Sequence, residues 1–202
     1  MHNQKGFSLI ELLVVITIIA IAVGIIIPVY SSMKPTIRIN GAARQIMGDL
    51  MWAKMRAVSE NNDYVIAFGK AGTPTDISND TYYIYDDDDD NFSTVGTETS
   101  ELVKTVVISD EYKEVGYGYT VSKRTDNSTN LTEAVTFNSG GATKPIWFKF
   151  EPNGRNNISG GIYLILDEDE ANGSKERSRS ITVSTAGRDK IWNYNAGSDE
   201  WE

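Results

Sequence analysis

The stretch FSLIELLVVITIIAIAVGIII, from Phe7 to Ile27, decides the architecture of this chain. The polar side chains in it are those of Ser8, Glu11 and Thr17. A helix of these 21 residues would be about 30 Å long, which matches the thickness of the hydrocarbon core of a bilayer. We therefore expect residues 7–27 to form a transmembrane helix.

Three other interpretations of this stretch account for less of it. A core helix that is apolar on every face needs a large protein around it, and the rest of this chain is polar. A cleaved secretory signal fits Lys5 and the Ala20-Ile21-Ala22 pattern, but the apolar run continues to Ile27. A plain membrane anchor leaves Glu11 unexplained, since an ionisable group in lipid is costly and marks a functional site by default.

Composition divides the chain into two parts. Residues 1–60 carry six basic and three acidic side chains, whereas residues 61–202 carry 13 basic and 25 acidic ones. The net charge of −9 and the pI near 4.7 argue against nucleic-acid binding, which needs a basic surface. A small basic cluster is expected to lie in an exposed loop: Lys175, Arg177 and Arg179. The chain has no cysteine and one histidine, His2, so no disulfide, thiolate metal site or enzyme activity is expected.

The N-terminal sequence Lys5-Gly6-Phe7-Ser8-Leu9-Ile10-Glu11, followed by an apolar helix, resembles that of type IV pilins and type II secretion pseudopilins. In that family a prepilin peptidase cuts after the glycine, the new terminal residue is methylated, and the glutamate five residues after the cut guides assembly. The resemblance implies a leader of residues 1–6, cleavage between Gly6 and Phe7, and N-methylation of Phe7. It also implies that Glu11 is the assembly carboxylate.

The physics of a helix terminus agrees with that role for Glu11. A carboxylate one turn from a helix N-terminus meets the positive end of the macrodipole, but in hydrocarbon it still requires a counter-charge. The freed Phe7 amine of a neighbouring chain would provide it. The resemblance further implies a single-pass protein of the bacterial inner membrane with its head in the periplasm. The implied partners are the membrane, prepilin peptidase, the inner-membrane assembly platform and other pseudopilins or pilins, with no nucleic acid among them.

Residues 28–60 are expected to continue the helix in amphipathic form. Apolar side chains recur there at helical spacing, with charged side chains between them. The recurring residues are Ala43, Ile46, Met47, Leu50, Ala53, Ala57 and Val58. The spacing of Met47, Met51 and Met55 predicts that these three side chains pack in the core. One face of the segment should therefore pack on the head.

Residues 61–202 are expected to form a β-rich globular head, which gives an α+β fold with a long, partly transmembrane N-terminal helix packed on an antiparallel sheet. Segments rich in Val, Ile, Thr, Tyr and Phe alternate there with clusters of Gly, Asn, Asp and Ser. The expected strands are 64–68, 81–85, 102–108, 117–121, 134–137, 146–150, 162–166 and 180–184. Asn153-Gly154 predicts a hairpin turn between two of them, and Asn172-Gly173 a second turn.

Three stretches narrow the resemblance to the H-type minor pseudopilins (GspH) and FimT-like minor pilins. Residues 49–58, leading into Tyr64–Phe68, look like the passage from the helix to the first strand in that group. Phe150–Gly154 and Ile181–Arg188 are similar to its closing strands. This implies a minor pseudopilin of a type II secretion system, a structural subunit of the periplasmic pseudopilus. The alternatives are a minor type IV pilin that primes a pilus or DNA-uptake filament and, from another class, a secreted calcium- or carbohydrate-binding β domain.

A run of acidic side chains contains the candidate cation site. Oxygens at the first, third, fifth and twelfth positions of a calcium loop would come from Asp87, Asp89, Asn91 and Glu98. Phe92 stands at the sixth position, where such a loop needs glycine. The competing interpretation is a solvated acidic loop between strands, which we prefer because runs of like charge repel one another and stay hydrated. No cofactor is therefore expected, and calcium is the candidate if there is one.

Overall fold

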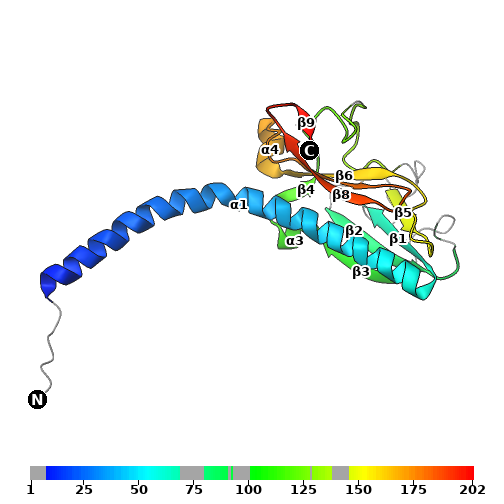
Figure 1. Cartoon of the computed structure of the whole chain (residues 1–202), viewed down its shortest axis with the longest axis horizontal. Helices are drawn as coiled ribbons and strands as arrows, with labels where there is room; N and C mark the ends of the chain where they lie inside the picture. Colours follow the sequence, from blue (N-terminus) through cyan, green and yellow to red (C-terminus); the bar gives the residue numbers. More distant parts are fainter. Residues whose placement is uncertain (1–7, 69–79, 91, 93–100, 128, 138–145) are drawn as a thin grey trace, which may run out of the picture. The chain divides into compact units, whose positions relative to one another are not determined.

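The computed structural model describes residues 8–68, 80–90, 92, 101–127, 129–137 and 146–202. The chain consists of two compact units, Met1–Ile37 and Arg38–Glu202. Helix α1 (Leu9–Glu60) begins in the first unit and ends in the second, and the remaining elements belong to the second (Figure 1). The fold class is α+β, as the sequence predicts.

The described part of the first unit is helical and exposed. Every residue from Ser8 to Lys34 is exposed, although most of these side chains are apolar. The hydroxyls of the segment bond back to the helix itself, as Thr17 Oγ1 does to Leu13 O at 2.7 Å. Within the described residues, α1 is the helix that is long and apolar enough to cross a membrane.

The second unit contains two sheets, and every strand pair among its described residues is antiparallel. The first sheet has the order β3-β2-β1-β5, with β1 (Asp63–Phe68), β2 (Thr81–Asp87), β3 (Leu102–Val107) and β5 (Ile146–Phe150). The second has the order β4-β6-β7-β8-β9, with β4 (Val115–Tyr117), β6 (Gly160–Leu166), β7 (Arg179–Val183), β8 (Asp189–Asn195) and β9 (Glu200–Trp201). Two short helices follow β3 and β6, namely α3 (Ile108–Glu111) and α4 (Asp167–Asn172).

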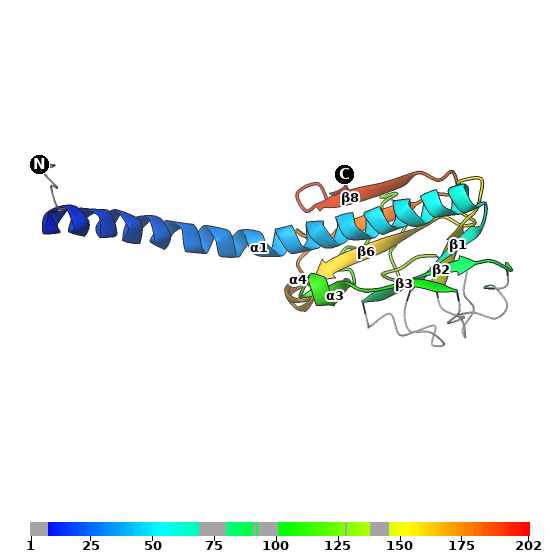
Figure 2. The same cartoon turned by 90° about the horizontal axis from the view of Figure 1, so that it is seen from below.

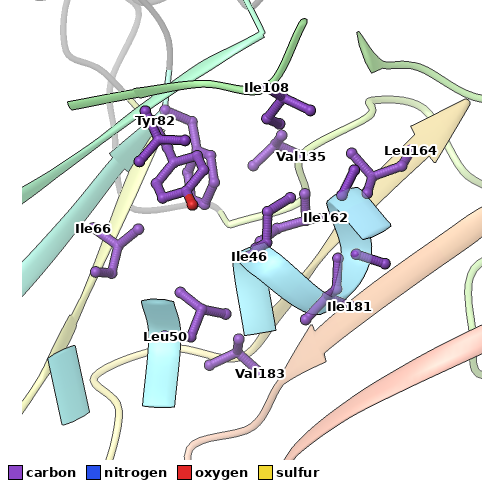
Figure 3. Packing of buried hydrophobic residues seen from close by; sticks show 14 of the residues in the cluster. Ile46, Leu50, Ile66, Tyr82, Ile108, Val135, Ile162, Leu164, Ile181 and Val183 are labelled. Carbon is purple, nitrogen blue, oxygen red and sulfur yellow. The ribbon is translucent and has the colours of Figure 1, made fainter. Parts of the chain in front are cut away.

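One hydrophobic core joins both sheets to the second half of α1. Ile46 and Leu50 of α1 belong to the same buried cluster as Ile66 of the first sheet and Val183 of the second. Figure 3 shows the two helix side chains pointing into the space between these strands. Figure 2 shows this half of α1, in cyan, lying along the strands of the head. One face of α1 thus packs on the sheets from Ile39 to Ala57.

The methionine prediction is wrong for two of the three side chains. Met47 packs partly buried against the core, but Met51 and Met55 are 56% and 65% exposed. The buried stripe of α1 consists of Ile39, Ala42, Ala43, Ile46, Leu50, Ala53 and Ala57. Each residue of a helix turns by about 100°, so Met51, one residue after buried Leu50, points to another face. Val58, which the sequence placed among the recurring apolar residues, is also exposed, at 51%.

The strand predictions are confirmed for six segments and wrong for two. The strand expected at 117–121 ends at Tyr117, where β4 finishes. The segment expected at 134–137 forms a single bridge, between Val135 and Ile162, instead of a strand. Strands β8 and β9 were missed because β8 is mostly polar and half-buried, so its sequence lacks the apolar run that marked the others.

Asn153-Gly154 forms a turn closed by one antiparallel bridge, Phe150 to Asn156, but it does not join two strands of one sheet. Gly154 has φ +75°, and its N–H donates to Glu151 O at 2.9 Å. The flanking strands β5 and β6 belong to different sheets, so this turn carries the chain from one sheet to the other. Gly173, in the second predicted turn, ends α4 in the left-handed conformation with φ +67°.

Candidate assembly and cation sites

Glu11 lies in the first turn of α1, where the positive end of the helix dipole favours a carboxylate. The backbone N–H groups of Glu11 and Leu12 donate to Ser8 O at 3.0 and 3.2 Å. The Glu11 carboxylate makes no hydrogen bond or ion pair with the residues that the structure describes. Gly6 and Phe7, the expected cleavage and methylation positions, lie outside those residues. Glu11 is thus exposed and available to a partner from elsewhere.

Two of the four expected cation ligands come together, and a third carboxylate joins them. Oxygens of Asp87, Asp89 and Glu101 all lie within 4.8 Å of one another. Asp87 is buried, Glu101 half-buried and Asp89 exposed. The other expected ligands, Asn91 and Glu98, lie outside the described residues. Carboxylate oxygens are ligands of the kind that calcium takes. Calcium binds six to eight oxygens in all, and these three carboxylates would supply part of that number.

Sequence reasoning missed Glu101, although the sequence contains a signal for it. Strands β2 and β3 pair with Tyr85 opposite Leu102. In an antiparallel ladder the residue after Tyr85 lies opposite the residue before Leu102, and Asp86 N donates to Glu101 O at 2.9 Å. Treating 81–87 and 102–107 as one antiparallel pair would have placed Glu101 beside the acidic run.

Protein groups already contact much of the acidic run. The N–H of Phe92 donates to Asp87 Oδ1 at 3.2 Å, and the Phe92 ring is buried. This explains why phenylalanine stands where a calcium loop would have glycine. Asn62 Nδ2 donates to Asp88 Oδ1 at 2.8 Å. Lys149 Nζ lies 2.6 Å from Asp90 Oδ1, so at least one carboxylate of the run has a cationic partner within the chain.

The ion pairs of Lys149 outweigh its burial. Desolvation alone would lower the pKa of this ammonium, but hydrogen bonds to Asp63 and Asp90 raise it above the ordinary lysine value. Lys149 therefore stays charged and holds the end of the acidic run against β5.

The two closing segments of the head meet at one point on α1. Lys54 Nζ donates to the carbonyl oxygen of Gly187. A Cβ on Gly187 would collide with Gly154 O, and Gly187 has φ +69°. Asn156 Nδ2 also donates to Ser184 O, at 2.7 Å. Glycine at position 187 is thus required both by backbone conformation and by the close approach of the two segments.

A buried tyrosine connects α1 to the first sheet. Tyr82 OH donates to Asp49 Oδ2 at 2.5 Å, and Lys104 Nζ donates to Asp49 Oδ1 at 2.6 Å. Burial, and then the hydrogen bond to Asp49, raise the pKa of Tyr82 far above its ordinary value. A hydroxyl that stays protonated suits a structural hydrogen bond and opposes acid–base catalysis.

Two family models match this chain. The model of the prokaryotic N-terminal methylation motif matches residues 1–27. The model of the type II transport protein GspH matches residues 42–187, which contain most of the head. No curated protein matches the chain significantly.

Solved structures of two kinds of protein are similar to the chain. The type IV minor pilin FimU of Pseudomonas aeruginosa is 14% identical over 76% of this chain and 87% of its own, with a TM-score of 0.42. A second crystal form of FimU is 16% identical over 75% and 90%, also at 0.42. The minor pseudopilin EpsH of the Vibrio cholerae type 2 secretion system is 10% identical over 76% and 95%, at 0.43. At these identities the likeness concerns the fold alone.

Proposed function

Because the chain belongs to the family of the type II transport protein GspH, we propose that it is a minor pseudopilin of a type II secretion system. In this role it is a structural subunit of a periplasmic pseudopilus and performs no catalysis. The observation that carries the proposal is the match of the GspH model to residues 42–187. The methylation motif at residues 1–27 and the exposed apolar stem support it.

Processing is the first step of the proposed function. Prepilin peptidase removes residues 1–6 by cutting between Gly6 and Phe7, and Phe7 is then N-methylated. The stem holds the subunit in the inner membrane, with the head in the periplasm, until the assembly platform draws it into the filament. A side chain at position 6 would obstruct the cut, so Gly6→Val should leave the leader attached.

The N-terminus of the mature protein separates the proposal from its rival in another class. Mass spectrometry should find a methylated N-terminus at Phe7. An N-terminus at Val23 would indicate an ordinary cleaved signal and a secreted β domain. Normal trimming of the Gly6→Val variant would also contradict the processing step.

Glu11 has the central role in assembly. Its carboxylate has no partner within the described residues and stands among exposed apolar side chains, Leu9 at 82% and Leu12 at 59%. In hydrocarbon an unpaired carboxylate is costly, so pairing with the Phe7 amine of a neighbouring subunit favours entry into the filament. The same pairing fixes the register of the two stems.

Co-purification with the other pilin-like subunits, normalised to membrane level, tests this role. Glu11→Gln keeps the shape and removes the charge, so the variant should be inserted and cleaved, but its incorporation should fall about tenfold or more. Thr17→Val is the matched control, because the Thr17 hydroxyl bonds within its own helix and should not affect incorporation. Normal incorporation of Glu11→Gln would overturn the assembly role. Partners from a surface pilus instead of a secretion system would assign the chain to the minor type IV pilins.

A further inference from the structure

Arg179 is a buried cation without a counter-charge. It is the first residue of β7 and 9% exposed, whereas the sequence predicted an exposed loop for it. Its guanidinium donates from Nε to Asn40 Oδ1 at 2.7 Å and from Nη1 to Ser178 O at 2.9 Å. Both acceptors are neutral. Among the residues that the structure describes, no carboxylate lies within ion-pair distance of Arg179.

Arg177, two residues before Arg179, has the carboxylate partners that Arg179 lacks among the described residues. Arg177 donates to both carboxylate oxygens of Asp169 and pairs with Glu168 at 2.6 Å. The hydrogen bond to Asp169 raises the pKa of Arg177. Desolvation lowers the pKa of Arg179, and no neighbouring carboxylate opposes that effect. A guanidinium remains charged in proteins, so Arg179 keeps an uncompensated buried charge, which is costly.

Arg179 lines a cavity of about 410 Å³ at the surface of the head. The lining residues are Asn40, Ala43, Arg44, Arg179, Ile191 and Asn193. Two of them are arginines and none is acidic, in a chain whose net charge is −9. Arg44 is exposed and forms no ion pair with any described residue. Asn40 accepts from Arg179 through Oδ1, which leaves its Nδ2 group free to donate into the cavity.

We propose that this cavity receives an acidic side chain of a neighbouring filament subunit, bound by Arg179 and Arg44. The inference rests on the proposed function in that it requires filament neighbours. A carboxylate fits the planar donor fork of a guanidinium, supplies the missing charge of Arg179, and can accept from the Asn40 amide. The docked subunit would thus complete an electrostatic arrangement that the isolated chain leaves open.

The first arm of the test uses acetate as the carboxylate probe on the full chain in detergent. At about 200 mM sodium acetate, compared with sodium chloride of equal ionic strength, the thermal midpoint should rise by about 3 °C. This rise should be absent in Arg179→Met, and in Arg44→Gln it should be less than half of the wild-type rise. Arg155→Met is the matched control, because Arg155 is exposed and unpaired among the described residues, and it should respond as the wild type does. No acetate response, or an undiminished response in either cavity variant, would overturn the proposal.

The second arm measures co-purification with the other pilin-like subunits at equal membrane level. Arg44→Glu reverses an exposed charge without disturbing the core, and its incorporation should fall about tenfold, while Arg155→Glu should match the wild type. If Arg44→Glu is incorporated as well as the wild type, the docking proposal fails and the proposed function is unaffected. An acetate response with normal Arg44→Glu incorporation would assign the cavity to a small free anion and overturn docking of a subunit. If the wild-type chain itself is not recovered with such subunits, the proposed function fails.

Discussion

The two halves of α1 form one continuous helix, but their side chains are packed differently. In the first unit every described residue up to Lys34 is exposed, including large apolar side chains such as Ile16 and Ile25. In the second unit α1 buries one stripe completely, with Ile39 and Leu50 at 0% exposure. The same backbone conformation therefore serves a segment that must be covered from outside the chain and a segment that the chain covers by itself.

The difference lies in the size and pattern of the side chains. Four of the seven residues of the buried stripe are alanine, so the backbone of α1 can approach the strands closely. The stem instead has Leu, Ile and Val on all its faces, so packing one face of the helix against the head would leave the other apolar faces in water. Lipid, or the stems of neighbouring subunits, can cover all faces at once. Helix formation is thus decided locally, but what covers a helix is decided by its surroundings.

The largest expected effect comes from cutting α1 between the two units. A chain of residues 38–202 should be soluble without detergent, fold cooperatively, and give a circular dichroism spectrum with more β than helix, because its core is contained in the second unit. A chain of residues 54–202 is the control. It lacks Ile39, Ile46 and Leu50 from the core and should fail to fold. Aggregation of 38–202, or a stable 54–202, would break the comparison between the two halves of α1.

A pair of leucines sharpens the same comparison with single substitutions. Leu50→Ala empties a fully buried position and should lower the free energy of unfolding of the head by about 2–5 kcal/mol. Leu13→Ala, in the exposed stem, should change it by less than about 0.5 kcal/mol. Tryptophan fluorescence during denaturation in detergent measures both, since all four tryptophans belong to the second unit. Equal effects would mean that stem and head unfold as one unit.

Most of the architecture could be predicted from sequence because its signals are local. The apolar run to Ile27, the helical spacing around Leu50 and the β-branched segments each depend on a few neighbouring residues. Pairing between distant segments could not be predicted in this way. The Asn153-Gly154 turn was correctly placed, but nothing local shows that the strands it connects belong to different sheets.

The site residues likewise divide into those that local sequence could identify and those that distant contacts bring into place. Asp87 and Asp89 could be proposed because they are close in sequence, whereas Glu101 arrives only through the pairing of β2 with β3. Arg179 could not be recognised as a buried cation, since its burial depends on Asn40 of α1, 139 positions away. Met51 and Met55 show the converse error. Their spacing correctly predicts a helix, but the side of the helix on which they lie is exposed instead of packed in the core.

The point where the closing segments meet α1 gives the next smaller effect. Gly187→Ala should destabilise the head by about 2 kcal/mol or more, because φ is +69° and the new Cβ meets the backbone oxygen of Gly154. Gly173→Ala is the matched control, with φ +67° but no atom within 4 Å of a Cβ, and should cost about 1 kcal/mol. Chemical denaturation of residues 38–202 compares the two. Equal losses would show that the close contact between the closing segments contributes nothing beyond backbone conformation.

The smallest expected effect tests whether the acidic run of the head, unlike the stem, is satisfied without anything from outside the chain. Asp87 already accepts from the Phe92 N–H and Asp90 faces Lys149, so the acidic run has internal partners. Adding calcium, or removing it with a chelator, should therefore move the thermal midpoint of residues 38–202 by less than about 1 °C, since a ligand stabilises only in proportion to its binding. A calcium-dependent rise of about 5 °C or more, absent with magnesium and lost in Asp89→Asn, would instead assign an ion to the Asp87, Asp89 and Glu101 cluster. Asp110→Asn, outside that cluster, is the control, and a loss of the rise in this variant as well would mean that calcium acts through general charge screening.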